Sequence, residues 1–356
     1  MEEGIYLAGL HYVGISQKKL HQIFEKKENY KYVYDSLSLS FLKKYLFSNK
    51  QIEYILERKM KLKLDFIKNK LEKRKVKIVT IFSKKYPDLL KQISNPPFLF
   101  YLRWKIDNSP KIAVIWSRKM TSYWKQVIKK IIPNVSRYFT IVSGGASGCD
   151  TQWHITAMKN WNKTISIIWT WIDIDYPVWN KKLYDSIVDS CGWVISIFPV
   201  NEVWNPYNFP VRNEIVAWLS IWVYVIEAKA KSWTLITSNL ALENWKDLFA
   251  TPWGIFNINS EWCNNLIKNW CAKIVTNSED ILEEYNINSI KKISKIKKFA
   301  CKIEEEIYNQ LMLESFTIDD LFKKLKIDIK TLALKLSLME VNSLIKKWIW
   351  GKYEVY

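Results

Sequence analysis

A glycine-rich run is the feature of this 356-residue chain whose residue types and spacing best suit binding chemistry. The run is Ser143-Gly144-Gly145-Ala146-Ser147-Gly148-Cys149-Asp150, and it joins an apolar segment to a helical pattern. Backbone N–H groups of a glycine-rich loop at a helix N-terminus can surround an anion such as a phosphate. A tight structural turn has the same composition, so the run alone leaves both interpretations open.

A second junction of this kind lies upstream, where Trp116-Ser117-Arg118 follows the apolar residues 112–115 and precedes Thr121-Ser122-Tyr123. The guanidinium of Arg118 would add a forked donor for a phosphate. Any helix N-terminus has a similar composition, so this junction predicts anion binding only together with the first.

Several side chains invite a catalytic interpretation, and none of them completes an active site. His154 is expected to pack or cap a helix, Asp173 and Asp175 to fix a turn or bind water, and Glu227 stands alone at a strand end. No nucleophile, base and oxyanion set assembles from the sequence. The five cysteines lack zinc-ligand spacing, so we expect no metal, no cofactor and no enzymatic turnover.

The formal net charge of +19 is concentrated in two stretches. Residues 50–85 carry 13 Lys or Arg against 4 acids, and residues 291–302 carry 6 Lys against none. Such a surface suits a polyanion, although Lys, Asn and Ile all have AT-rich codons and genomic bias would produce part of the same charge. The start of the sequence lacks a signal peptide's pattern and no apolar run is long enough to span a bilayer, which predicts a cytoplasmic protein.

The tryptophan content is anomalous, with 19 Trp against 9 Gly. Trp first occurs at residue 104 and then repeatedly at turns, as in Asn160-Trp161-Asn162, where glycine is the usual residue. Reassignment of UGA to glycine, with the gene translated as if UGA encoded Trp, would explain this pattern. It predicts glycine at most of the nineteen Trp positions, including Trp116, Trp169, Trp171 and Trp233. A Trp-rich surface that stacks nucleic-acid bases is the alternative.

The elements that must position these loops follow from the hydrophobic pattern. Residues 1–75 are helical, with an apolar stripe expected at Leu56, Met60, Leu64, Ile67 and Leu71. From 76 to 287, short β-branched segments alternate with segments long enough for one helix each. This pattern predicts an α/β fold with a mainly parallel sheet that is covered on both faces and binds ligands at the carboxyl ends of its strands. The expected strands are 112–115, 140–142, 165–168, 194–197 and 223–226.

The remaining residues predict a basic linker over 288–300 and a small domain over 301–356. Thr317 is placed as the N-cap of one helix, a second helix is expected over 331–340, and the chain closes on two short apolar segments. Short helices followed by a strand pair are typical of a winged helix.

Five ordered motifs give the chain a family resemblance. If Trp is allowed at glycine positions, it resembles the DNA-processing protein A (DprA/Smf) family, whose signature is Ser-Gly-x-Ala-x-Gly-x-Asp followed by His. The matching segments, which lie within residues 86–284, are the glycine run with His154, residues 169–180 with Tyr176-Pro177-Val178-Trp179-Asn180, Phe209-Pro210-Val211-Arg212-Asn213, residues 225–228, and residues 232–243.

The resemblance implies a Rossmann-like, doubly wound domain that binds single-stranded DNA without sequence specificity, forms a homodimer and loads the RecA recombinase, in natural transformation and recombination. The DNA-contacting residues that it implies are Ser117, Arg118, Ser143, Gly144, Gly145, Asn180, Lys181, Arg212 and Asn213. Ser147 and Glu214 stand where the family usually or often has Arg, which removes two positive charges from the expected groove.

Two other functions remain open. A nucleotide-cleaving phosphoribohydrolase has a related Rossmann-like fold, but its glycine-rich loop and its paired catalytic Arg and Glu are not apparent here. A regulator that reads duplex DNA through the C-terminal winged helix is the second alternative.

Overall fold

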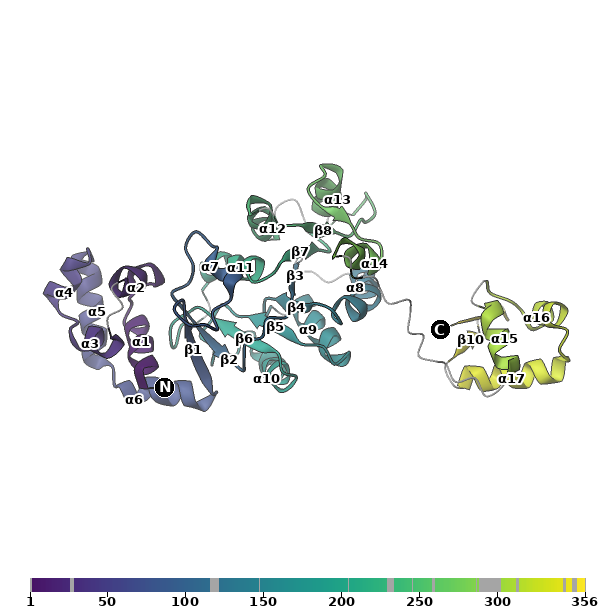
Figure 1. The fold of residues 1–356 in the computed structure, drawn as a ribbon, viewed down its shortest axis with the longest axis horizontal. Coiled ribbons are helices and arrows are strands. Elements are labelled where there is room, and N and C mark those ends of the chain that lie inside the picture. The colour runs from purple at the N-terminus through teal and green to yellow at the C-terminus, as the bar shows by residue number, and fades with distance from the viewer. Residues whose placement is uncertain are drawn as a thin grey trace. The chain divides into compact units, whose positions relative to one another are not determined.

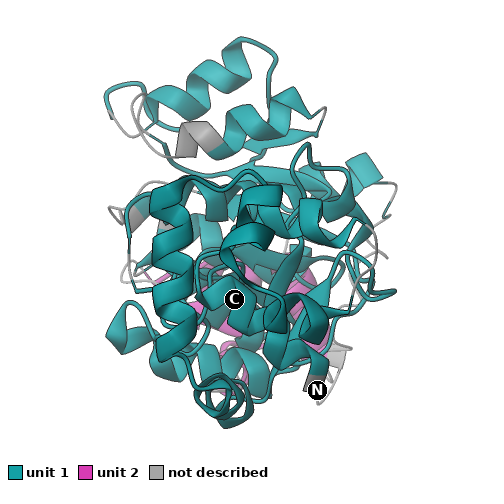
Figure 2. Ribbon diagram, turned by 90° about the vertical axis from the view of Figure 1, so that its left-hand side faces the viewer, with its two compact units in different colours: residues 1–287 teal, residues 288–356 magenta. Residues whose placement is uncertain are grey.

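The structure is a computed structural model with two compact units, residues 1–287 and 288–356 (Figure 2). It describes residues 2–25, 29–115, 122–146, 148–203, 205–228, 234–244, 246–257, 260–285, 287, 302–311, 314–341, 344–347 and 351–355.

Unit 1 begins with a group of short helices, most of them started by a polar cap. The helices are α1 (Glu2–Tyr12), α2 (Gln17–Phe24), α3 (Tyr30–Asp35), α4 (Leu39–Lys44), α5 (Asn49–Lys61) and α6 (Leu64–Lys73). The side chains of Ser16, Asn29, Ser38 and Ser48 accept hydrogen bonds from backbone N–H groups in the first turns of α2 to α5. These caps satisfy donors that have no partner within a helix and explain the helix starts.

The continuous apolar stripe expected from Leu56 to Leu71 is wrong. The chain leaves the helix at Leu62, whose ψ of 122° is extended, so α5 and α6 are separate helices with separate apolar faces. Met60 is 82% exposed, whereas Ile67 and Leu71 are buried. The 3.6-residue period holds only within one continuous helix. The spacing across Leu62 therefore predicted one stripe where there are two helices.

The α/β part of unit 1 is built on a nine-stranded sheet in the order β1-β2-β6-β5-β4-β3-β7-β8-β9 (Figure 1). The strands are β1 (Val76–Thr80), β2 (Leu99–Arg103), β3 (Lys111–Ile115), β4 (Thr140–Ser143), β5 (Thr164–Ile167), β6 (Trp193–Ser196), β7 (Trp222–Val225), β8 (Leu248–Ala250) and β9 (Lys273–Ile274). Strands β3 to β9 pair in parallel, and β1 and β2 pair antiparallel. The predicted mainly parallel sheet is therefore confirmed, and β1, β2, β8 and β9 are added to the five expected strands.

Helices cover both faces of this sheet. The helices are α7 (Asp88–Lys91), α8 (Ser122–Val135), α9 (Cys149–Lys159), α10 (Lys181–Asp189), α11 (Asn208–Trp218), α12 (Thr234–Glu243), α13 (Glu261–Lys268) and α14 (Glu279–Leu282). Alternate residues of β3 belong to different cores: Ile112 and Val114 pack with α8 and α9, and Ala113 and Ile115 pack on the side of α7, α11 and α13. Burial on both faces explains why the strands are uniformly apolar.

The N-terminal helices share one hydrophobic core with the sheet. This core joins Leu7 and Leu10 of α1 to Tyr101 of β2 and to Tyr184 and Ile187 of α10. His11 Nδ1 lies 3.0 Å from Tyr101 Oη, which adds a buried polar contact across the same interface. Unit 1 is continuous in these contacts, so the domain boundary expected at residues 75 and 76 stays a prediction.

Asp173 and Asp175 have a different role from the one expected. Arg74, just after α6, donates to Asp173 Oδ1 at 2.9 Å and to Asp175 Oδ2 at 3.0 Å, and it also reaches Asp185 of α10 at 3.0 Å. The two carboxylates thus join the end of the helical segment to the α/β part. They do so through a guanidinium that is about 100 residues away in sequence, beyond the reach of local turn reasoning.

Unit 2 has the predicted winged-helix elements. They are α15 (Lys302–Leu311), α16 (Ile318–Leu325), α17 (Ile329–Val341), β10 (Ile345–Lys347) and β11 (Tyr353–Val355). Thr317 caps α16 in a reciprocal capping box with Asp320. Phe316 bridges to Tyr353, which ties the start of α16 to the antiparallel β10–β11 pair.

Two contrasting groups occur among the described tryptophans. Trp104, Trp161 and Trp270 have positive φ of 87°, 59° and 59°, and Trp161 and Trp270 are each 96% exposed. Trp171 and Trp222, by contrast, are fully buried in the cores. Positive φ favours glycine, so only the first group shows the backbone conformation expected of recoded glycine.

Lys246 stabilises the end of α11. Its ammonium donates to the carbonyl oxygens of Ala217 at 2.9 Å and Trp218 at 3.0 Å and also to that of Ser220. Burial lowers the pKa of Lys246 to about 8, so the side chain is still mainly protonated at neutral pH. We expect Lys246→Met to lower the free energy of unfolding by about 1.5–3 kcal/mol, because the hydrogen bonds from a charged donor disappear. Denaturant unfolding at pH 7 measures this, with the exposed Lys268→Met as control; equal midpoints would contradict the capping role.

Candidate functional site

The predicted glycine loop lies at the carboxyl end of β4, as expected for a ligand-binding loop of a parallel sheet. A Cβ atom added at Gly144 would lie 1.4 Å from Arg212 Nη1, and one added at Gly145 would lie 2.2 Å from Tyr184 Oη. A side chain at either glycine would therefore displace Arg212 of α11 or Tyr184 of α10, which approach the loop backbone closely.

Asp150, in the first turn of α9, fills part of the concave side of this loop. Its carboxylate accepts from Ser143 Oγ at 2.9 Å and from the Ala146 N–H at 3.0 Å, and Arg212 Nη1 lies 3.9 Å away. Both side chains of the charged pair are at most 8% exposed. The loop thus already holds an internal anion, so a backbone N–H that the sequence assigned to a bound phosphate is used within the chain.

His154 of α9 is buried in the core, where it connects the loop to β5. It is fully buried, with Nε2 3.0 Å from Gly144 O and Nδ1 2.6 Å from Thr164 Oγ1. A carbonyl oxygen can only accept, so Nε2 carries the hydrogen that Gly144 O accepts. The single hydrogen of the Thr164 hydroxyl lies between two acceptors, Nδ1 and the Ile141 carbonyl oxygen at 2.9 Å. Burial lowers the pKa of His154, which keeps the ring neutral. The expectation that it packs a helix agrees with this geometry.

The Tyr-Pro-x-x-Asn segment clamps the outer side of the loop. Asn180 Nδ2 donates to Gly145 O at 3.0 Å, and its Oδ1 accepts from Thr151 Oγ1 at 3.2 Å. Tyr184 Oη lies 3.0 Å from the same Gly145 carbonyl, and burial raises the pKa of this phenol. These hydrogen bonds attach the loop at Gly145 to residues of α9 and α10.

Arg212 lies beneath aromatic rings of the same region. Its guanidinium carbon is 4.8 Å from the ring centre of Phe209 and 5.6 Å from that of Trp169, and the residue is 3% exposed. Stacking of a guanidinium on aromatic faces lowers the cost of burying its charge. Arg212 is thus a buried positive charge next to the loop, and its neighbour Asn213 is also buried.

Most of the predicted DNA contacts therefore build the loop from inside. Buried positions are occupied by Ser143, Gly144, Gly145, Asn180, Arg212 and Asn213. Lys181 at the start of α10 is exposed, and Lys182 beside it is exposed too. Ser117 and Arg118 lie outside the described residues. Whether these positions touch DNA stays a prediction.

Sequence reasoning missed several members of this site. Asp150 is part of the glycine-rich motif, but its role inside the loop is not visible in the sequence. The same holds for Tyr184, because a hydrogen bond to a loop on another element leaves no local sequence pattern. Large exposed side chains also flank the site segments: Trp179 is 73% exposed next to Asn180, and Tyr207 is 84% exposed just before α11. Their exposure is likewise invisible in the sequence.

Two features were not found in the described part of the chain. Among the residues that the structure describes, no cluster of His, Cys, Asp and Glu is able to hold a metal ion. In the same part of the chain, no helix has the length and apolar character to cross a membrane.

Comparisons with known proteins agree with the motifs and the fold. The family model of the DNA recombination-mediator protein A matches residues 77–286. The DNA processing protein DprA of Streptococcus pneumoniae is 38% identical over 202 residues, which is 56% of this chain and 71% of the relative. Protein Smf of Synechocystis sp. is 30% identical over 288 residues, covering 78% of this chain and 71% of the relative.

Solved structures show the same relationship. The X-ray structure of DprA from Streptococcus pneumoniae superposes with a TM-score of 0.67 at 31% identity, covering 79% of this chain and 97% of that one. A Helicobacter pylori DNA processing protein A structure, described as showing a single-stranded DNA binding mode, has a TM-score of 0.52 at 24% identity and covers 59% of this chain and 95% of that one. The latter shows the shared fold, and together with the family match these findings establish that the chain belongs to the DNA recombination-mediator protein A (DprA/Smf) family.

Proposed function

We propose that this protein acts in DNA processing by binding single-stranded DNA, without sequence specificity, at the carboxyl ends of β3, β4 and β5. The observation that carries this proposal is the hydrogen-bonded loop at Gly144 and Gly145, with the buried Arg212 beside it and the exposed Lys181 and Lys182 following Asn180. A preorganised loop beside exposed cations suits a phosphate backbone, whose contacts carry no sequence information.

The partners follow from the family rather than from the geometry. We propose that the protein forms a homodimer in the cytoplasm and loads RecA onto single strands in recombination, including natural transformation. RecA filament assembly on strands coated with single-strand-binding protein should accelerate when this protein is added. An unchanged rate would remove the loading role while leaving DNA binding intact.

A binding role fits the site better than catalysis does. His154 is buried and hydrogen-bonded on both ring nitrogens, and Asp150 is enclosed by Ser143, Ala146 and Arg212. Neither group is available to a substrate in this arrangement. Release of base from a nucleoside monophosphate, abolished in Glu227→Gln, would instead support the phosphoribohydrolase alternative.

The exposed surface of α17 in the winged-helix unit is partly apolar. Helix α17, which follows α16 as a recognition helix would, exposes Ile329, Leu334 and Leu338 at 48%, 60% and 43%. Readout of base edges depends mainly on hydrogen-bonding side chains such as Arg, Asn and Gln. Tight binding to one duplex sequence would contradict the proposal.

Replacing Lys181 and Lys182 together should weaken binding to every single strand alike. We expect the double Ala variant to make the log–log salt slope shallower by about 0.7 for each phosphate that is no longer neutralised. Fluorescence anisotropy with oligo(dT) and a mixed-sequence strand at several salt concentrations measures this, with Lys43→Ala/Lys44→Ala on α4 as the control. A change of sequence preference at constant salt slope would refute the phosphate contacts. The variant Arg118→Ala is expected, like the double Ala variant, to weaken binding to every strand and to make the salt slope shallower.

We also propose that UGA encodes glycine in the native gene at a subset of the tryptophan positions. Support is greatest at Trp104, Trp161 and Trp270, because their φ is positive and non-glycine residues there cost about 1–3 kcal/mol each. The buried Trp169 and Trp171 do not have positive φ, and Trp116 and Trp233 lie outside the described residues. For these four the proposal rests on the family pattern alone.

The recoding proposal predicts UGA codons at the three positive-φ positions and glycine masses in peptides of the protein from its native host. Codon sequencing and peptide mass spectrometry test this directly. UGG codons with tryptophan masses would contradict recoding. They would favour the alternative, in which exposed rings such as Trp179 stack on nucleic-acid bases.

A further inference from the structure

We propose that the free edge of β1 binds an extended acidic peptide segment of a partner protein as an additional strand. β1 is the first strand of the nine-stranded sheet and pairs only with β2 among the strands described. An edge strand presents unpaired backbone N–H and C=O groups, and a second chain can pair with them.

The register identifies which backbone groups face outward. The Ile81 N–H donates to Phe98 O at 2.9 Å, and the antiparallel pairing continues from there with Val79 opposite Phe100 and Lys77 opposite Leu102. In an antiparallel pair, alternate residues exchange hydrogen bonds with the partner strand and the backbone groups of the residues between them point away. The N–H and C=O groups of Val76 and Ile78 therefore face the open edge.

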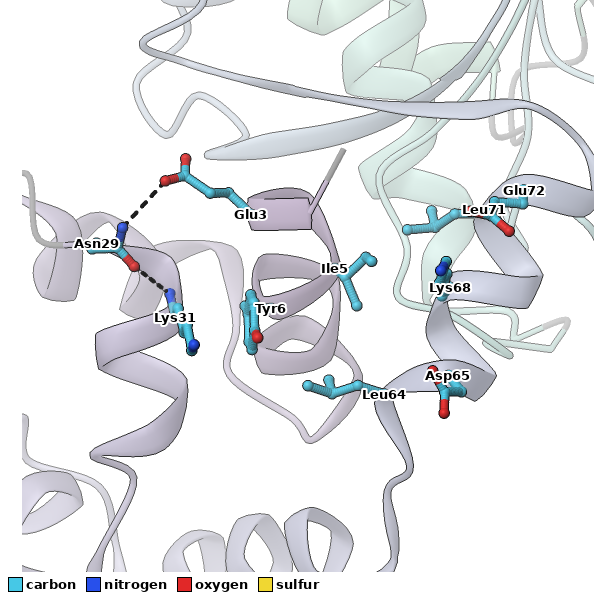
Figure 3. A pocket seen from close by; sticks show the side chains of 10 residues that line it. All are labelled: Glu3, Ile5, Tyr6, Asn29, Lys31, Leu64, Asp65, Lys68, Leu71 and Glu72. Carbon is cyan, nitrogen blue, oxygen red and sulfur yellow. Dashed lines mark hydrogen bonds between the residues drawn. The ribbon is translucent and has the colours of Figure 1, made fainter.

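Space for a partner lies along this edge. A cavity of about 1110 Å³ is lined by every residue of β1 and is bounded by Gly4 and Leu7 of α1, by Leu71 of α6 and by residues 102 and 104–106. A second cavity of about 590 Å³ shares Glu3, Leu71 and Glu72 with the first and extends between α1 and α6 (Figure 3). The two together form a groove that continues past the end of the strand.

The side chains of the groove favour an acidic and partly apolar segment. Lysines at 75, 77, 85 and 105 line the first cavity, against the two acids Glu3 and Glu72. The second cavity adds Lys31 and Lys68 and one further acid, Asp65, so lysines outnumber acids in the groove as a whole. Apolar walls are supplied by Ile78 and Ile106 in the first cavity and by Ile5, Tyr6 and Leu64 in the second. A strand with alternating acidic and apolar residues matches both features, because successive side chains of a strand point to opposite sides.

The same charges argue against two other occupants. A second copy pairing through its own β1 would bring its Lys75 and Lys77 against these lysines, and like charges across a strand pair are unfavourable. A DNA strand would neutralise the lysines, but its phosphates supply no donors for the outward carbonyl groups of Val76 and Ile78. A peptide satisfies the lysines, the N–H groups and the carbonyl groups together.

The test uses the full-length protein and a fluorescein-labelled peptide of sequence Asp-Val-Glu-Val-Asp-Val-Glu. We expect saturable binding by anisotropy. Of two peptides N-methylated at one or the other alternate set of residues, the one whose methylated set faces β1 should not bind and the other should, because alternate N–H groups of a strand point to opposite sides. Lys75→Glu/Lys77→Glu should weaken binding roughly tenfold, as expected when two partly exposed ion pairs are removed. Lys129→Glu/Lys130→Glu on α8 makes the same charge change elsewhere and should bind normally.

Amide hydrogen exchange separates strand addition from other modes. Without peptide, Val76 and Ile78 should exchange fast and Lys77 and Val79 slowly; with peptide, the first two should become protected. Ile78→Pro removes one outward donor and should abolish binding while the β1–β2 ladder is retained. Three results would overturn the proposal: binding without protection of these amides, protection that rises with protein concentration alone, and displacement of the peptide by oligo(dT) with no amide protection, which would assign the edge to nucleic acid.

Discussion

Asp150→Ala is expected to lower the free energy of unfolding of unit 1 by about 3–5 kcal/mol, the usual cost of removing one partner of a buried charge pair. The carboxylate faces Arg212 at 3.9 Å and accepts from Ser143 Oγ and the Ala146 N–H, so the substitution removes the anion that pairs with this guanidinium and with two hydrogen-bond donors. A decrease of this size is a large part of the stability of a typical domain.

The change should also affect binding, because the loop at Gly144 and Gly145 loses an internal support. Guanidinium unfolding followed by circular dichroism measures stability, and anisotropy with oligo(dT) below the melting temperature measures affinity. Asp150→Asn keeps the size and one acceptor and should cost less than Asp150→Ala, whereas Asp189→Ala at an exposed position of α10 should cost little. A stability decrease below about 1 kcal/mol for Asp150→Ala would contradict the role given to the buried pair.

Acidification is expected to destabilise unit 1 through His11. Burial lowers the pKa of His11 to about 3 in the folded protein, against the ordinary value of 6.5 in the unfolded chain. Between these two values the unfolded state binds the additional proton at this histidine, so the contribution of His11 to stability is constant above about pH 6.5 and falls as the pH decreases toward 3. Each unit of this fall costs about 1.4 kcal/mol, or nearly 3 kcal/mol at about pH 4.5.

The variant His11→Gln removes this titration while leaving a group able to accept from Tyr101 Oη. Its free energy of unfolding should be lower than that of the wild type at about pH 7.5 but should fall less between about pH 7.5 and pH 4.5. His154, whose pKa burial also lowers, contributes a residual slope in both proteins. The matched control is His21→Gln on α2. Parallel pH profiles for the wild type and His11→Gln would exclude His11 as a source of the acid sensitivity.

The local code of the chain determined much of the fold. Runs such as residues 112–115 and 223–226 are apolar and β-branched over the length of one strand, and strands buried on both faces need that composition whatever surrounds them. Thr317 followed by Asp320 specifies a helix start by itself, because the capping hydrogen bonds span only three residues. Ordered motifs identified the family for the same reason, since each depends on neighbours in sequence.

Tertiary structure decided which residues of the site face inward. The sequence named Ser143, Asn180 and Arg212 as contacts for DNA, yet each is buried and engaged with the chain itself. Solvent exposure depends on what packs over a residue, and no local pattern reports that.

The same limit applies to pairing between distant charges. Arg74 meets Asp173 and Asp175 across about 100 residues, and Asp150 meets Arg212 across about 60. The sequence also did not predict that β1 lies at the edge of the sheet, because the order of strands depends on how distant segments pair. What a residue is follows from the sequence, whereas the partners that give it a role are brought to it by the packing of elements far apart in the chain.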